Sequence, residues 1–172
     1  MRTRSSSRAT STGGRRPQNS ALGTGLRLLG GRAHSRAEMQ RKLARKGYTS
    51  EEVEAALVRL TELGYLDDLS FAEGLVRVRS ASRGPRALSA ELARRGVARD
   101  QADLALASYD DGRQLASAVR IIERTYANRD ITQFREMLDR VGNKLLRLGF
   151  STTIVRGACR AVVSGTPPVG ED

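Results

Sequence analysis

Apolar side chains recur every three or four residues along most of the chain, which is the period of a helix that buries one face. The clearest example is the stretch 35–71, where two such runs are separated by glycine. The first run is Met39 and Leu43, and the second is Val53, Ala56, Leu57, Leu60 and Leu63. Each run is followed by a glycine, Gly47 or Gly64, and glycine adopts the left-handed conformation that ends a helix at low cost. The pattern predicts two helices and the start of a third.

Polar residues mark where these helices begin. Ser35 is followed three residues later by Glu38, and Thr49 by Glu52. This spacing is typical of a capping box, in which each side chain accepts a hydrogen bond from the backbone N–H of the other residue. An aspartate of the pair 67–68 can cap the third helix. We therefore predict helix starts close to residues 36, 50 and 68.

The same arrangement occurs three times along the chain. The apolar pair and glycine that end a middle helix are Met39, Leu43 and Gly47, then Leu88, Leu92 and Gly96, then Val141, Leu145 and Gly149. Before each lies a first-helix stripe: Leu22, Leu26 and Leu29, then Phe71, Leu75 and Val78, then Leu115, Val119 and Ile122. After each lies a third-helix pair: Val53 and Ala56, then Ala102 and Ala105, then Val155 and Ala158. Self-similarity at a period of this kind indicates tandem structural repeats.

We therefore predict an all-α protein of three tandem three-helix modules, elongated and curved. The modules are expected at residues 20–66, 67–109 and 110–164, with the last middle helix lengthened and capped by Asp130. Residues 1–19 contain five arginines, no acidic residue and almost no apolar side chain, which predicts a disordered basic arm. Residues 165–172 are expected to form a flexible tail.

Four short motifs occur in order in the first half: KLARKGY at 42–48, GYLDD at 64–68, FA at 71–72 and GPR at 84–86. In these motifs the chain resembles the RecX family of bacterial regulators of the RecA recombinase, over about residues 22–163. The resemblance implies tandem three-helix modules that bind in the groove of a RecA filament on single-stranded DNA. It implies modulation of RecA, usually by limiting filament extension and the recombinase and ATPase activities, and hence regulation of homologous recombination, DNA repair and the SOS response.

Residue types that carry catalysis or bind metals are scarce. His34 is the only histidine and lies in a loop, and Cys159 is the only cysteine and lies on the apolar pattern of the last helix. An active site needs an acid–base pair, a nucleophile with its base, or a metal. We therefore expect no enzyme activity, no cofactor and no metal. One cysteine and no apolar run near the length of about 20 residues that spans a bilayer favour a cytoplasmic protein without a membrane segment.

The net charge of +11, from 30 basic and 19 acidic residues, favours a polyanionic or acidic partner. The basic residues concentrate around the first two middle helices, and the alternative is that they are long side chains covering the edges of the core. Our candidate contacts with a RecA filament or DNA are Arg36, Arg41, Lys42, Arg45, Lys46, Arg77, Arg79, Arg83, Arg86, Arg94 and Arg95.

The third helices start with TSEEVE, ARDQAD and STTIVR, and the first two are acidic where a recognition helix would need to read bases. Aromatic residues make up only 4% of the chain, so the sequence offers few side chains on which the bases of a single strand could stack. A nucleoprotein, which presents both phosphate and acidic protein surface, therefore fits better than bare DNA. The resemblance implies that this nucleoprotein is the RecA filament on single-stranded DNA, with at most a weak direct DNA contact, and we expect a monomer. The alternative function is a non-specific DNA-binding or nucleoid-associated protein.

Overall fold

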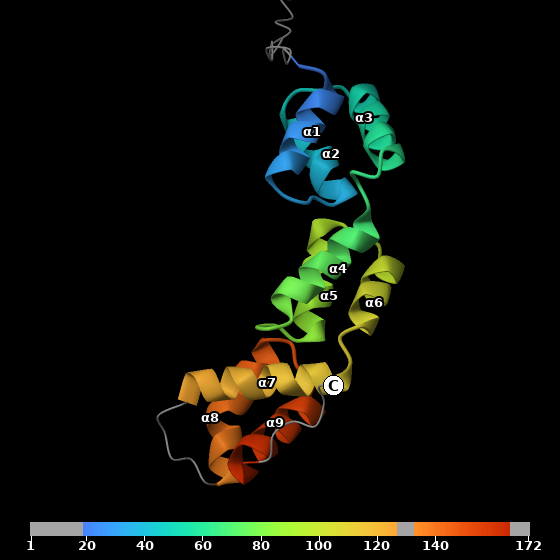
Figure 1. The fold of residues 1–172 in the computed structure, drawn as a ribbon. Coiled ribbons are helices and arrows are strands. Elements are labelled where there is room, and N and C mark those ends of the chain that lie inside the picture. The colour runs from blue at the N-terminus through green and yellow to red at the C-terminus, as the bar shows by residue number, and fades with distance from the viewer. Residues whose placement is uncertain (1–18, 127–132, 166–172) are drawn as a thin grey trace, which may run out of the picture.

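The computed structural model describes residues 19–126 and 133–165. Within these ranges the chain forms nine helices and no strand, which confirms the predicted all-α fold (Figure 1). The predicted arm and tail lie, apart from Asn19 and Gly165, outside the described residues. The helices are α1 Ala21–Gly31, α2 Arg36–Arg45, α3 Ser50–Glu62, α4 Asp68–Arg79, α5 Pro85–Arg95, α6 Arg99–Ala107, α7 Asp111–Tyr126, α8 Phe134–Arg147 and α9 Thr152–Ser164.

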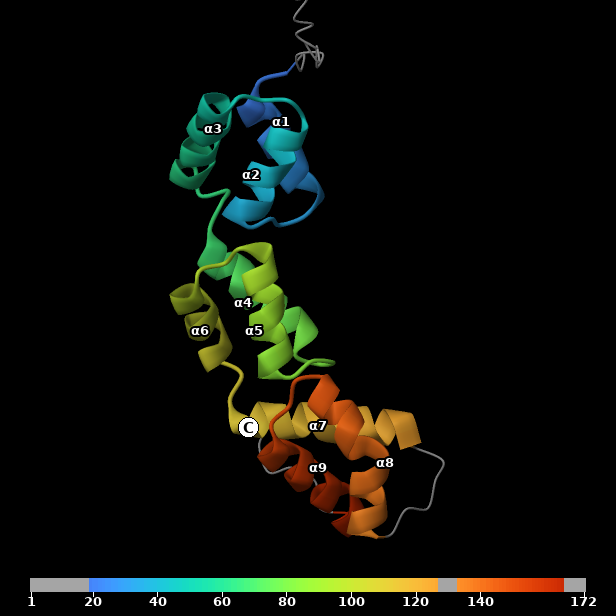
Figure 2. The same ribbon diagram turned by 180° about the vertical axis from the view of Figure 1, so that it is seen from behind.

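The helices form three groups in a row, which we call the first (α1–α3), second (α4–α6) and third (α7–α9) modules. Figures 1 and 2 show the first module at one end of an elongated molecule, the second in the middle and the third at the other end. Helix α7 lies across the long direction of the molecule, so the third module is turned relative to the second (Figure 1). The exact boundary residues between the modules remain a prediction.

The core of each module is built on its middle helix, as the sequence predicts. The six apolar residues predicted for these helices are at most 1% exposed: Met39, Leu43, Leu88, Leu92, Val141 and Leu145. The pairs predicted for the third helices are buried as well. All four glycines predicted to end helices, Gly47, Gly64, Gly96 and Gly149, have φ between 74° and 94°. These parts of the repeat are confirmed.

The stripes predicted for the first helices are partly wrong. Helix α1 buries Ala21, Thr24 and Gly25, whereas Leu26 is 37% exposed. The small residues face inward because α1 lies close to α3: a Cβ on Gly25 would lie 2.7 Å from Cδ1 of Leu60. Helix α4 likewise buries Ala72 and Val76, while Val78 is 72% exposed. Only the third unit keeps its predicted inner positions, with Val119 and Ile122 buried.

The helix caps confirm one capping box and correct another. Thr49 and Glu52 form the complete reciprocal pair. Ser35 accepts from the backbone N–H of Glu38, but the Glu38 carboxylate bonds to other side chains, so the second half of that box is wrong. Asp67 caps α4. Helix α8 begins at Phe134 with Gln133 in the cap position, so the prediction of Asp130 as its cap is also wrong.

The two joints between modules share one packing device. The glycine that ends a middle helix lies against an alanine near the start of the preceding module's middle helix. Gly96 lies against Ala37 at the first joint, and Gly149 against Ala87 at the second. A Cβ on either glycine would collide with that alanine, so each joint depends on the absence of a side chain there.

The second joint is reinforced by backbone hydrogen bonds and by the core. The N–H of Gly84 donates to the carbonyl of Leu148 at 2.8 Å, and the N–H of Arg86 to that of Gly149 at 3.2 Å. One cluster of buried residues continues from the second module into the third, including Leu92 and Phe150. The first module has a separate cluster of its own. Apart from the packing of Gly96 against Ala37, the first joint therefore depends on polar contacts.

Candidate functional site

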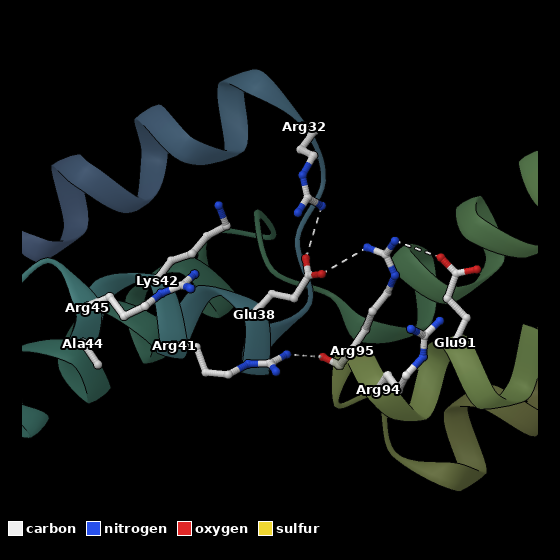
Figure 3. Close-up of a pocket in the computed structure, with 9 residues that line it drawn as sticks. All are labelled: Arg32, Glu38, Arg41, Lys42, Ala44, Arg45, Glu91, Arg94 and Arg95. Atoms are coloured by element: carbon white, nitrogen blue, oxygen red, sulfur yellow. Dashed lines mark hydrogen bonds and ion pairs between the residues drawn. The ribbon is translucent and has the colours of Figure 1, made fainter.

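A groove of about 830 Å³ lies at the first joint, between the first and second modules (Figure 3). Six cationic side chains and two carboxylates contribute to its lining. The lining residues are Arg32, Glu38, Arg41, Lys42, Ala44, Arg45, Glu91, Arg94 and Arg95. We call this the joint groove. Its residues come from the end of α1, from α2 and from the last turn of α5, so both modules form it.

Helical periodicity explains why the cations gather on one side. Met39 and Leu43 bury one face of α2, so Arg41 and Arg45, spaced one turn apart, are left on an exposed face. On α5 the buried Leu92 likewise leaves Arg94 exposed. The joint then brings the end of α5 to the start of α2, so the two cationic faces meet across the groove.

Arg95 connects the two modules through both its side chain and its backbone. Its guanidinium donates to Glu38 of the first module at 3.0 Å and to Glu91 of its own helix at 2.9 Å. It also lies over the ring of Phe71, 5.8 Å from the centroid. Its carbonyl accepts from the Ser35 hydroxyl at 2.6 Å and from the Arg41 guanidinium at 3.3 Å. Three of these five contacts, with Glu38, Ser35 and Arg41, cross the first joint.

Glu38 is the carboxylate on which these contacts converge. Only 14% of its side chain is exposed, and it accepts from Arg32 at 3.2 Å and from Nδ1 of His34 at 3.1 Å as well as from Arg95. Burial raises the pKa of Glu38, but the hydrogen bond from His34 and the charges of Arg32 and Arg95 outweigh it, so the pKa lies below its ordinary value. Glu38 is therefore ionised at neutral pH.

His34 is buried beside Glu38 and is held neutral. Burial lowers its pKa, and the positive charges of Arg32 and Lys42 lower it further, against the opposing effect of the Glu38 hydrogen bond. A neutral imidazole that donates through Nδ1 suits the ionised carboxylate. The histidine therefore orients Glu38 and adds no charge to the groove.

Several cations of the groove are not neutralised by carboxylates. Within residues 19–126 and 133–165, no hydrogen bond or ion pair reaches the side chains of Lys42, Arg45 or Arg94. Arg41 donates only to the carbonyls of Ala37 and Arg95. Like charges close together raise the local positive potential, so the groove attracts anions.

The structure places the predicted site residues in two sets. Arg41, Lys42, Arg45, Arg94 and Arg95 come together in the joint groove. Outside its lining, five others are exposed on α4, the α4–α5 loop and the ends of α2 and α5: Lys46, Arg77, Arg79, Arg83 and Arg86.

Arg36 lies elsewhere, paired with Glu54 at 2.6 Å, and lines a different cavity with Asp68. Its backbone N–H donates to Asp68 at 2.7 Å, which adds a polar contact to the first joint. Arg32 was not among the residues predicted from the sequence. It belongs to the groove through its contact with Glu38, six residues along the chain, and that spacing gives no sign of a contact. Glu38 was predicted only as the capping-box partner of Ser35, and Glu91 was not selected; the signal that the sequence offered is that each is an isolated acidic residue among basic ones.

Chemistry beyond binding finds no support in the described part of the chain. It contains no group of three His, Cys, Asp or Glu side chains that could hold a metal ion. Cys159 is fully buried, and burial raises the pKa of its thiol, so it is a poor nucleophile. None of the helices described here is long and apolar enough to cross a membrane.

Comparison with known proteins identifies the relatives of this chain. Residues 21–60 match the family model described as "RecX, first three-helix domain", and residues 67–106 match "RecX, second three-helix domain". A "Regulatory protein RecX" of Trichlorobacter lovleyi is 39% identical over 150 residues, which are 84% of this chain and 96% of that protein. The chain belongs to the RecX family. Another of that name, from Mycolicibacterium vanbaalenii, is 44% identical over 99 residues, which are 56% of this chain and 54% of that protein.

A solved RecX structure shows the same fold. The crystal structure of RecX from Lactobacillus salivarius matches with a TM-score of 0.74, covering 84% of this chain and 94% of that one, at 22% identity. The likeness extends beyond the two matched domains, and it confirms the fold in which the joint groove lies. By name, RecX proteins are a family of regulatory proteins, which agrees with a binding site rather than an active site.

Proposed function

We propose that this chain regulates a RecA recombinase by binding along the RecA filament on single-stranded DNA. We expect it to limit filament extension and to lower recombinase and ATPase activity, and so to regulate recombination and DNA repair. The observation that carries the proposal is the cationic joint groove, which crosses two modules of an elongated member of the RecX family. Such a regulator acts as a monomer in the cytoplasm, without a cofactor.

The shape and charge of the chain suit an extended nucleoprotein partner. A filament repeats the same protein surface and the same phosphates along its length, so a row of modules can contact several repeats at once. We propose that the joint groove supplies the central contact. The exposed residues outside it, Lys46, Arg77, Arg79, Arg83 and Arg86, add contacts on either side, and Arg36 contributes least because Glu54 already pairs with it.

The direct test is ATP hydrolysis by the cognate RecA on single-stranded DNA, with and without this chain. We expect a lower rate with the wild-type chain and a partial return of the rate with Arg45→Ala plus Arg94→Ala. A double variant of exposed arginines outside the groove, Arg77→Ala plus Arg79→Ala, is the matched control and should inhibit more strongly than the groove variant. A rate that wild-type chain leaves unchanged at saturation would refute the proposal.

The cations that lack carboxylate partners also favour a second candidate function, non-specific DNA binding. The two differ in what they require of RecA. Binding to a RecA filament and to the same DNA bare should be compared at matched salt, because phosphate contacts weaken steeply as salt rises. A filament regulator prefers the filament, whereas a nucleoid-type protein binds both alike.

A further inference from the structure

The joint groove has two walls that belong to different modules. Arg41, Lys42 and Arg45 on α2 form one wall, and Arg94 and Arg95 at the end of α5 form the other (Figure 3). A ligand that fills the groove therefore contacts the first and the second module at once. Its affinity depends on how far apart the two walls are held.

The composition of the walls indicates which ligand suits them. Lys42, Arg45 and Arg94 have no hydrogen bond or ion pair among the described residues, so a bound anion relieves their repulsion across the groove. The guanidinium of arginine binds phosphate through paired hydrogen bonds. The lining contains no aromatic side chain on which a base could stack. Recognition through regularly spaced phosphates, without contact to bases, is the chemistry that remains.

The spacing of the walls is set by contacts outside the cationic surface. Arg95 holds Glu38 across the joint at 3.0 Å, and its carbonyl accepts from Ser35 at 2.6 Å. Gly96 lies directly against Ala37, where any side chain would push the modules apart. Because these contacts are short, the joint presents the two walls in a defined arrangement before a ligand arrives, which favours binding.

We propose that the joint groove is a bridging site for the phosphate backbone of one nucleic-acid strand, and that its affinity depends on the joint geometry set at Gly96 and Arg95. The inference rests on the proposed function in one respect: that function identifies the bound strand as the DNA of the RecA filament. The site itself belongs to this chain alone, and it is tested without RecA.

The first experiment measures binding of a fluorescein-labelled 20-residue oligothymidylate by anisotropy in about 50 mM salt. Arg45→Ala on one wall and Arg94→Ala on the other should each weaken binding by roughly fivefold to tenfold and reduce the log–log salt slope by about 0.7, as expected for one lost phosphate contact. Arg77→Ala and Arg79→Ala, also exposed but outside the groove, are the controls and should cause smaller losses. Failure of the wild-type chain to bind, or equal losses in both sets, would overturn the proposal.

The second experiment changes the joint without changing the charge of the groove. Gly96→Ala places a Cβ against Ala37, while Gly47→Ala places one in open space at a similar φ of +89°. Both replace a helix-ending glycine, so the control has the same backbone strain. We expect the Gly96 variant to weaken oligothymidylate binding several-fold more than the Gly47 variant, and Ala37→Leu to act in the same direction.

Joint geometry is read from energy transfer between labels on Val58→Cys in α3 and Ala107→Cys in α6, both exposed positions. The native Cys159 is buried and stays unlabelled. A widened distance with unchanged affinity in the Gly96 variant overturns the proposal. So does an unchanged distance in both joint variants, because the joint then does not set the spacing.

A labelled 20-residue oligoglutamate provides the competing ligand class. If it binds more tightly than oligothymidylate and loses affinity in the same wall variants, the groove takes an acidic protein segment and the phosphate proposal is wrong. These results also separate the two proposals. Oligothymidylate binding in the groove with no effect on RecA refutes the function and leaves the bridging site standing. RecA inhibition by a wild-type chain that does not bind oligothymidylate refutes the bridging site and leaves the function standing.

Discussion

At the first joint the two modules meet through charged and polar side chains, while at the second the buried core runs on from one module into the next. Both joints nevertheless use the same glycine-against-alanine packing, at Gly96 and at Gly149. The difference teaches that a repeat can keep its geometry while the forces that hold it change. Polar contacts respond to pH, salt and charged ligands, whereas a shared core does not. We therefore expect the first joint to be adjustable and the second to be fixed.

The largest expected effect comes from truncating the two cores separately. Leu43→Ala and Leu92→Ala each remove a fully buried side chain and should cost about 2–5 kcal/mol. Leu43 belongs to the separate cluster of the first module. Its loss should therefore lower the midpoint temperature only of the thermal transition in which the first module unfolds. Leu92→Ala should lower the transition of the second and third modules together. Calorimetry in which both variants shift one common transition equally would show that the cores are not independent.

A second comparison places an alanine at two glycines with similar backbone conformation. Gly149 (φ +94°) lies against Ala87 at the second joint, whereas Gly47 (φ +89°) has nothing within 4 Å of an added Cβ. Gly149→Ala should cost about 2 kcal/mol or more, from left-handed strain plus overpacking, and Gly47→Ala about 1 kcal/mol from strain alone. Urea unfolding measures both. Equal losses would mean that the close packing at the joint can relax.

The third prediction concerns Glu38 and pH at the first joint. Glu38→Gln should lower the free energy of unfolding of the first module by about 1.5–3 kcal/mol, because the Glu38 carboxylate bonds to charged or polar partners on both modules. The pKa values of Glu38 and His34 are both lowered on folding, so each contributes stability above its unfolded pKa that is lost as pH falls.

The contribution of His34 should thus be lost as pH falls below about 6.5, and that of Glu38 as pH falls below about 4.5. The charged groups that face this pair are Arg32, Lys42 and Arg95. Melting temperatures between about pH 5 and pH 3 should fall more for the wild-type chain than for Glu38→Gln. Parallel curves for the two proteins would contradict this role for Glu38.

The smallest effect is expected at Arg36. Its ion pair with Glu54 has 40% and 58% of the two side chains exposed, so Arg36→Ala should cost at most about 1 kcal/mol. It should also leave oligothymidylate binding near the wild-type value, because Arg36 does not line the joint groove. A loss as large as that of Arg94→Ala would place Arg36 in the binding surface after all.

The parts of the fold that were predicted from the sequence are those with a strong local signal. The middle helices, their leucines and their terminating glycines follow from spacing alone. The first helices do not, because α1 buries small residues such as Gly25 against Leu60, and a stripe of leucines gives no indication of that close approach. Helix α4 also buries a small residue, Ala72, while Val78 of the predicted stripe is exposed.

The candidate site was predicted only in part for a related reason. Clusters of arginine are visible in the sequence, but Arg95 and Glu38 are 57 residues apart and meet only because of the fold. The same fold carries Arg36 away from the groove. Ser35 and Glu38 have the spacing of a capping box, yet the Glu38 carboxylate pairs with the guanidinium groups of Arg32 and Arg95 and not with the backbone N–H of Ser35. Long-range pairing of this kind leaves no periodic trace.

The hydrogen bonds at the joints have a consequence for how the repeat can grow. Carbonyl groups at the end of α8 accept hydrogen bonds from backbone N–H groups at the start of α5. The carbonyl of Arg95 at the end of α5 likewise accepts from the side chains of Ser35 and Arg41 at α2. In each case the end of one middle helix is bonded to the start of the middle helix in the preceding module. At the outer end, Gly47 has open space around it. A redesigned chain could append a fourth unit there by reusing the same contact, which makes this family a starting point for rods of chosen length.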